Sequence, residues 1–214
     1  MVFNLSEKNS LANQFLLELR DKAVQQDRMR FRKNLERLGE IMSYEISKQL
    51  HYTTKVIETP LSKTRVNIIK DQPLLITILR AGIPFFQGFL NFFDRSDAGF
   101  IGAYRRESLT EVTIKFDYIT SPITTGREII LIDPMLATGK SVIDSVQQLL
   151  KRGKPSHIHI ASLIAAPEGI KHLTEQMPVS YSIWTYAIDE KLDENYYIVP
   201  GLGDAGDLSY GSKL

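Results

Sequence analysis

The chain of 214 residues contains no cysteine. This absence excludes disulfide bonds, thiolate metal sites and a cysteine nucleophile, and it is compatible with a reducing compartment. The chain also lacks an excess of either charge, because 26 Lys and Arg residues against 25 Asp and Glu residues leave a net charge of +1. Nothing in this balance favours nucleic acid or an anionic membrane as a partner.

Long uninterrupted apolar runs are missing as well. Residues 73–93 are the most apolar stretch, but Arg80, Gly82, Pro84 and Gly88 interrupt them, which favours a strand, a loop and a helix over a membrane span. The first ten residues are polar where a signal peptide has its apolar core. We therefore expect a soluble, cytoplasmic protein.

The composition is that of an ordinary globular protein, with 43% hydrophobic and 24% charged residues. The length suits one large domain, and no repeat or linker divides it. We predict a single domain over residues 1–214, with amphipathic N-terminal helices in 10–50 and two short strands or an arm in 52–70.

The most informative stretch is EIILIDPMLATGKS, residues 128–141. Its apolar residues 129–132 are typical of a buried strand in a parallel sheet, which Asp133 and Pro134 then end. A loop of small and hydroxylated residues follows, and Ser141 leads into apolar residues at helical spacing. A loop in this position binds anions, because the first amides of a helix have no internal partner and carry partial positive charge.

Two classes of anion compete for this loop. The ending GKS resembles a Walker A loop, but that motif requires glycine where this chain has Pro134, whose fixed φ and missing amide spoil the phosphate cradle. A loop for a different phosphate ligand fits better, and the family resemblance given below implies which one: the carboxylate of Asp133 would accept hydrogen bonds from both hydroxyls of a ribose while the loop holds its 5′-phosphate.

Two more strands end in arginine. The run 73–79 leads into Arg80, Ala81 and Gly82, and a strand at 100–104 leads into Arg105. The carboxyl ends of parallel strands are where open α/β sheets bind ligands, and a guanidinium group suits a diphosphate. Residues from about 106 to 126 predict a flexible flap that excludes water from the site. The recurring order of strands and helices predicts an α/β fold, with a mainly parallel sheet flanked by helices.

The C-terminal stretch 195–211 predicts a hood over the site. Its four glycines surround Asp204 and Asp207 and predict an open backbone, poor at packing a core but able to present alternating N–H and C=O groups to a flat pyrimidine. A calcium loop is the alternative, but the stretch lacks the bidentate Glu and the spacing of an EF-hand.

The motifs ILRAG, DPMLATG and PGLGDAGD occur in the order found in the type I phosphoribosyltransferases, and the chain resembles the uracil phosphoribosyltransferases among them. The resemblance implies transfer of the phosphoribosyl group of 5-phosphoribosyl 1-diphosphate (PRPP) to uracil, giving UMP and diphosphate in pyrimidine salvage. It implies Mg²⁺ as cofactor, bound mainly through PRPP and water with Asp204 as the candidate protein ligand. It further implies a homo-oligomer, supported by the arm, and a nucleotide effector such as GTP.

The resemblance assigns each candidate residue a role. Catalytic roles go to Asp133, Asp204 and Arg105. PRPP binding goes to Arg80, Ala81, Gly82, Arg105, Asp133, Pro134, Met135, Leu136, Ala137, Thr138, Gly139, Lys140, Ser141 and Asp204. Uracil binding goes to Ile198, Gly203, Asp204 and Ala205.

Three points stay open. Lys140 departs from the family pattern and either pairs with phosphate or points to solvent, the usual place of a lysine. His157 and His159 share one face of a predicted strand, but a metal pair there has no third ligand in view. A non-catalytic regulator that keeps the PRPP fold and binds pyrimidine nucleotide is the alternative function.

Overall fold

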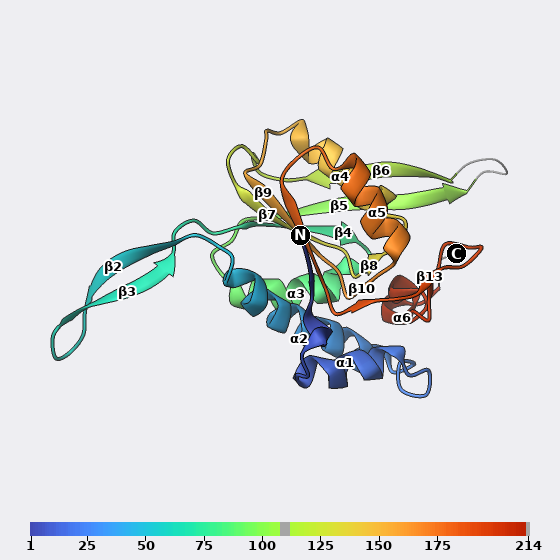
Figure 1. Ribbon diagram of the computed structural model, residues 1–214, viewed down its shortest axis with the longest axis horizontal. Helices are drawn as coiled ribbons and strands as arrows, with labels where there is room; N and C mark the ends of the chain where they lie inside the picture. The colour runs from blue at the N-terminus through green and yellow to red at the C-terminus, as the bar shows by residue number, and fades with distance from the viewer. Residues whose placement is uncertain (108–111, 213–214) are drawn as a thin grey trace.

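The computed structural model describes residues 1–107 and 112–212, and the side chains of 103–117 lie outside the description. A sheet of seven strands forms its centre, in the order β1-β11-β9-β7-β4-β5-β6 (Figure 1). All neighbouring pairs are parallel except β5 and β6. The strands are β1 (Val2–Asn4), β4 (Leu74–Leu79), β5 (Ala98–Glu107), β6 (Val112–Thr120), β7 (Glu128–Ile132), β9 (His157–Ala161) and β11 (Tyr181–Thr185).

Helices cover both faces of this sheet, with the N-terminal helices and α3 below it and α4 and α5 above it in the view of Figure 1. The strands are apolar along their whole length because alternate residues enter the cores on opposite faces of the sheet. Leu75 and Ile130 belong to the core that includes α1, α2 and α3, and Leu74 and Ile129 belong to the core that includes α4 and α5. The helices are α1 (Leu11–Arg20), α2 (Arg28–Ser47), α3 (Gly82–Phe92), α4 (Lys140–Leu150), α5 (Pro167–Gln176) and α6 (Ala205–Tyr210), with a 3₁₀ turn at Leu5–Glu7. The mainly parallel, helix-covered α/β fold is as predicted.

The N-terminal helices begin at side-chain caps. Ser10 caps α1 in a capping box with Asn13, and Asp27 caps α2 by accepting from the Arg30 amide at 3.0 Å. The two helices end at Arg20 and Ser47, within the predicted range of 10–50. Within the described chain, no helix has the length and apolar character that crossing a membrane requires.

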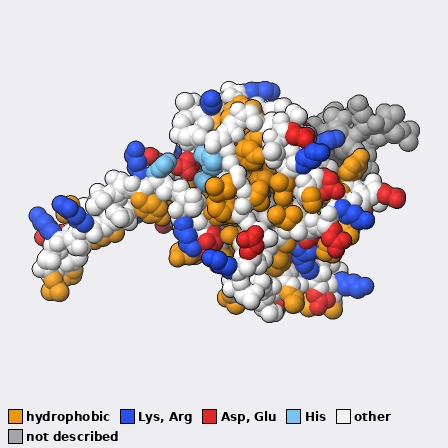
Figure 2. Space-filling model, viewed as in Figure 1, with side chains coloured by type: hydrophobic (Ala, Val, Ile, Leu, Met, Phe, Trp, Pro, Cys, Tyr) orange, Lys and Arg blue, Asp and Glu red, His pale blue; other side chains and the backbone are white. Residues whose placement is uncertain are grey.

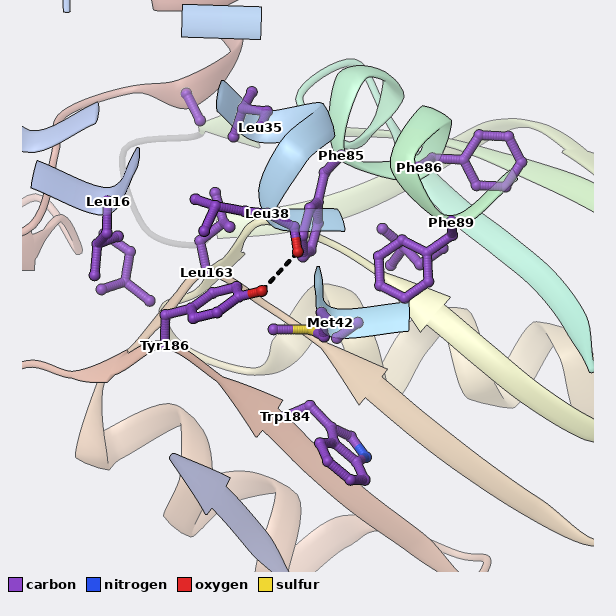
Figure 3. Packing of buried hydrophobic residues seen from close by; sticks show 14 of the residues in the cluster. Leu16, Leu35, Leu38, Met42, Phe85, Phe86, Phe89, Leu163, Trp184 and Tyr186 are labelled. Carbon is purple, nitrogen blue, oxygen red and sulfur yellow. Dashed lines mark hydrogen bonds between the residues drawn. The ribbon is translucent and has the colours of Figure 1, made fainter. Parts of the chain in front are cut away.

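The core beneath the sheet consists of large apolar side chains from α1, α2, α3 and the strands (Figure 3). Phe85 and Phe89 of α3 meet edge to face at 5.2 Å between ring centroids. The hydroxyl of the fully buried Tyr186 donates to the Leu38 carbonyl of α2 at 2.6 Å (Figure 3). Trp184 is buried and its ring stacks on that of Phe3, with 4.0 Å between the ring centroids.

A second, small sheet continues three of the strands past their carboxyl ends. Its order is β12-β10-β8 and both pairs are parallel. The strands are β8 (Met135–Leu136), β10 (Ile164–Ala165) and β12 (Ala187–Ile188). The predicted phosphate loop contains β8, so main-chain hydrogen bonds to its neighbours fix the loop.

Two hairpins leave the body at opposite ends (Figure 1). The arm, β2 (Tyr52–Glu58) and β3 (Lys63–Ile69), is an antiparallel pair whose residues are almost all exposed. The other hairpin pairs β5 with β6. It contains most of the predicted flap, whose tip lies outside the described residues.

Candidate active site

The turns after β4 and β7 emerge side by side, because the two strands are parallel neighbours with Thr77 opposite Ile132. Gly82 makes this approach possible, since a Cβ on it would lie 2.2 Å from the Thr77 hydroxyl and 3.2 Å from the Ile132 carbonyl. Arg80 and Asp133 therefore leave the same edge of the sheet from neighbouring strands. Of the predicted PRPP residues near them, Ala81 is half-buried and Gly82 is buried.

The loop from Asp133 to Gly139 turns directly into α4. The Asp133 amide donates to the Ala161 carbonyl at 3.0 Å, and its carboxylate Oδ1 accepts from the Met135 amide at 3.3 Å. Gly139 caps the helix with φ of 75°, a conformation that favours glycine. The helix begins at Lys140, slightly earlier than the sequence pattern indicates.

Side chains of this loop differ in their exposure. Thr138 and Ser141, whose hydroxyls are predicted phosphate ligands, are half-buried, as is Met135. Pro134, Leu136 and Ala137 are buried and contribute to the packing of the loop. Lys140 is exposed at the first position of α4, which favours the interpretation that its side chain points to solvent.

Arg80 links the strand edge to the C-terminal hood. Its Nη2 atom donates to Asp207 Oδ1 at 3.1 Å and to the Gly211 carbonyl at 3.3 Å. Both side chains of this ion pair remain well exposed, at 40% for Arg80 and 37% for Asp207. The side chain of Arg105, the other predicted diphosphate ligand, lies outside the described residues.

The hood differs from the open backbone predicted for it. Ala205–Tyr210 form a short helix, α6, which Asp204 caps by accepting from the Asp207 amide at 2.9 Å. The helix forms although it contains Gly206, because the capping hydrogen bond of Asp204 stabilises its first turn. Gly206 is buried beside Arg80 and Ala81. The prediction of a loop that packs poorly is therefore wrong for 205–210.

Ahead of this helix the hood is extended and tightly turned. Strand β14 (Ile198–Val199) pairs with β13 (Lys191–Leu192), and Tyr196 adopts a φ of 62° in the turn before β14. Of the predicted uracil ligands, Ile198 and Ala205 are buried, while Gly203 is exposed with φ of 91°.

A cavity of about 320 Å³ opens beside the hood. Gly203 and Asp204 line it together with groups that the sequence analysis did not select: Gln25, Gln26, Arg28, Leu202, Asp207, Leu208 and Ser212. Of these, Leu202 and Asp207 carried a signal, because both stand in the PGLGDAGD motif. Burial raises the pKa of the nearby Tyr210 phenol, with Arg32 and Arg80 acting in the opposite direction.

The carboxylates of the site fit Mg²⁺, which binds proteins through one or two carboxylates and takes its remaining ligands from phosphates and water. Asp133 and Asp204 supply hard oxygen donors and are half-buried. Among the described residues, no group of three or more His, Asp or Glu side chains could hold a metal on its own. That excludes a self-contained metal centre at His157 and His159 within this part of the chain.

Comparison with known proteins identifies relatives along the whole chain. Residues 6–212 match the family model described as uracil phosphoribosyltransferase. A uracil phosphoribosyltransferase of Porphyromonas gingivalis is 47% identical over 214 residues, 100% of this chain and 99% of the relative. One from Pyrococcus furiosus is 39% identical over 204 residues, covering 94% of this chain and 86% of the relative.

Two solved structures have a similar fold. The AQ2163 protein from Aquifex aeolicus has a TM-score of 0.88 and 31% identity, with 100% of both chains covered. A hypoxanthine phosphoribosyltransferase from Staphylococcus aureus has a TM-score of 0.50 and 14% identity, covering 80% of this chain and 85% of its own, and this likeness concerns the fold alone.

Proposed function

The chain belongs to the uracil phosphoribosyltransferase family, and from this membership we propose that it transfers the 5-phosphoribosyl group of PRPP to N1 of uracil, giving UMP and diphosphate. The observation that carries the proposal is the meeting of three segments at one sheet edge. These segments, distant in the sequence, are Arg80, the loop that begins at Asp133 and the hood around Asp204. The parallel pairing of β4 with β7 brings Arg80 beside the Asp133 loop, and the Arg80–Asp207 hydrogen bond joins Arg80 to the hood.

Asp133 and the start of α4 would bind the sugar half of the substrate. The carboxylate accepts hydrogen bonds from the two ribose hydroxyls, and the first amides of α4 with the Thr138 and Ser141 hydroxyls bind the 5′-phosphate. These contacts hold C1′ of the ribose in a fixed position, so that the reaction with the base becomes effectively intramolecular.

Arg80 and Arg105 would bind the diphosphate, whose negative charge grows as the bond from C1′ to oxygen breaks. Mg²⁺, held by PRPP oxygens, water and Asp204, would offset part of the same charge. The sugar passes through a cationic state that water would capture, and we assign the β5–β6 hairpin the exclusion of water.

The hood would present the base. Uracil offers two carbonyl acceptors with an imide N–H between them, and the backbone groups at Ile198, Gly203, Asp204 and Ala205 would match this pattern. N1 would then face C1′: the bond from N1 to C1′ forms as the bond from C1′ to the diphosphate oxygen breaks, and the N1 proton passes to the leaving diphosphate or to solvent.

The test is an assay with PRPP, Mg²⁺ and each of four bases: uracil, cytosine, orotate and hypoxanthine. UMP from uracil alone is the expected result. If the protein binds UMP but forms no product from any of the four bases, the alternative function, a non-catalytic regulator that binds pyrimidine nucleotide, replaces the proposed one. Adding GTP to the same assay tests for a nucleotide effector, which so far rests on resemblance.

We also propose a homo-oligomer formed through the arm, β2 and β3. An isolated two-stranded hairpin is marginally stable in water, yet this one exposes Val56, Ile57, Val66 and Ile68, with Leu61 at its tip 96% exposed. A second copy would cover these apolar side chains. Light scattering on the wild type and on Leu61→Asp with Val56→Asp tests this, and a wild-type monomer would contradict it.

A further inference from the structure

Asp189 lies outside every motif of the sequence, and its side chain binds the backbone of the hood at Gly201. Its Oδ2 atom accepts from the Gly201 amide at 2.8 Å. Its two oxygens also accept from Arg20 of α1, at 2.7 Å for Oδ1 and 2.9 Å for Oδ2. The Asp189 side chain is only 6% exposed and that of Arg20 23%. A bidentate pair this deeply buried fixes the geometry of both partners.

The same helix region holds the next backbone groups of the hood. Arg20 Nη1 also donates to the Gly201 carbonyl at 3.2 Å. The buried Gln25 donates from Nε2 to the Leu202 carbonyl at 3.1 Å and to the Leu19 carbonyl at 2.8 Å. Three side chains therefore satisfy the N–H and C=O groups of Gly201 and the C=O group of Leu202 from inside the molecule.

The residue that follows is left open to a ligand. Gly203 is exposed and lines the cavity beside the hood. In residues 1–107 and 112–212, no hydrogen bond uses the Gly203 backbone. Gly203 therefore follows directly on the turn that these side chains hold, and its backbone is available to a ligand in the cavity.

Asp189 is itself fixed by the small sheet that carries the phosphate loop. Its amide donates to the Ala165 carbonyl at 2.9 Å, directly after β12. Strand β12 pairs with β10, and β10 pairs with β8 inside the loop. Asp189 therefore connects the two segments: its backbone amide bonds to the small sheet that contains part of the phosphate loop, and its carboxylate bonds to the backbone of the hood.

We propose that Asp189 is a positioning residue for the base: with Arg20 and Gln25 it sets where the hood stands relative to the phosphate loop. The inference rests on the proposed function and deepens it, because correct spacing of base and ribose matters only to a protein that joins them. Loss of the clamp would let the hood move while the loop keeps its own main-chain bonds.

The test compares KM for the two substrates in Asp189→Asn, which keeps the size of the side chain but loses the charge opposite Arg20. KM for uracil should rise by about tenfold or more, the effect of losing a hydrogen bond to a charged group. KM for PRPP should stay within about twofold, because the loop is held separately. Gln25→Ala should raise KM for uracil in the same direction, and it supplies the test if Asp189→Asn does not fold.

Arg30→Gln is the matched control. It removes the Arg30–Glu18 ion pair, which has the same 2.7 Å length and also involves α1, but joins it to α2 without contacting the hood. We expect it to lower the melting temperature with both KM values unchanged. Folded variants that leave KM for uracil unchanged, or that raise both KM values equally, overturn the positioning role. A wild type that forms no UMP overturns the proposed function itself, and this inference with it.

Discussion

The two edges of the main sheet both carry charged side chains, but they use them differently. At the carboxyl edge, Arg80 and Asp207 pair while both stay more than a third exposed. At the amino edge, the pair of His159 and Glu128 is 4% and 18% exposed. A ligand can reach and exchange the contacts of the first edge. At the second edge the side chains hydrogen-bond one another beside a separate cavity of about 390 Å³, which Glu128, His157 and His159 help to line.

The amino edge is a continuous hydrogen-bonded network of His157, His159, Glu128, Ser182 and Trp184. His159 contacts Glu128 Oε2 at 3.1 Å and the Ser182 hydroxyl at 2.9 Å. That hydroxyl also contacts His157 at 3.1 Å and accepts from the Trp184 indole at 3.1 Å. Figure 2 shows His side chains beside acidic ones where the arm leaves the body. We expect the amino-edge network to serve stability, because the His159–Glu128 pair is largely buried, and we expect the exposed Arg80–Asp207 pair to exchange its contacts for those of a ligand.

The largest effect should come from Asp204→Asn at the carboxyl edge. Asn caps a helix as well as Asp does, so α6 should keep its cap and the stability should change little. Loss of the carboxylate should lower kcat/KM by about a hundredfold or more, as for other groups that stabilise developing charge. Activity and melting temperature are measured on the same sample. Full activity in the variant would show that the accessible carboxylate is not used.

Asp204→Ala sharpens this result, because it removes the cap as well as the charge. We expect it to lose the same activity as Asp204→Asn and about 1 kcal/mol of stability in addition. A larger activity loss than that of the Asn variant would mean that α6 itself, and not only the carboxylate, is needed in the site.

Arg80→Gln should have the next largest effect. The variant loses the guanidinium that we assign to the diphosphate, so KM for PRPP should rise by about tenfold to a hundredfold, the effect of losing hydrogen bonds to a charged group. KM for uracil and the melting temperature should change little, since the Arg80–Asp207 pair is exposed. Isothermal titration with PRPP and Mg²⁺ measures the affinity directly. An equal rise in both KM values would contradict the separation of the two substrates.

At the amino edge we expect stability to depend on pH. Burial, reinforced by His159, lowers the pKa of His157 to about 4 from 6.5. The hydrogen bond from His159 lowers the pKa of Glu128. The unfolded chain therefore binds protons more readily than the folded one, and stability falls as pH falls from about 6.5 towards 4.

His157→Gln, which cannot titrate, should flatten this fall by about 1 kcal/mol once solvent screening of the half-buried ring is allowed for. In a domain of this size that corresponds to about 2–4 °C in Tm. Tm is measured between pH 7.5 and 4.5 for both proteins. Turnover at pH 7.5 should stay within about twofold of wild type, and a larger loss would break the contrast between the two edges.

The carboxyl edge was largely predictable from sequence, and the reason is geometric. Apolar runs ending in Arg80 and in Asp133 were recognised as parallel strands, and parallel strands bring their carboxyl ends to one edge. Once the strands are adjacent, the turns must meet. The sequence could not order these strands by itself, and the position of Arg105 relative to them is a prediction still.

The contacts that hold the hood were not predictable in this way. Arg20 and Asp189 are 169 positions apart, and Gln25 and Leu202 are 177 apart. No periodicity relates such residues, because their meeting depends on the path of the whole chain. The helix α6 is not apparent from the sequence for a local reason. Two glycines and two aspartates within the five residues 203–207 indicate a turn, whereas in the structure Asp204 forms a capping hydrogen bond that begins a helix.

The smallest effect should come from Lys140. The side chain is exposed at the first position of α4, so any attraction to the 5′-phosphate is screened by solvent. Lys140→Gly should raise KM for PRPP by no more than about fivefold, the upper limit for an exposed pair, and leave KM for uracil unchanged. Lys140→Ala separates the charge from the extra backbone freedom of glycine. A tenfold rise in both variants would mean that the lysine folds over the bound phosphate, because only a partly buried cation contributes that much.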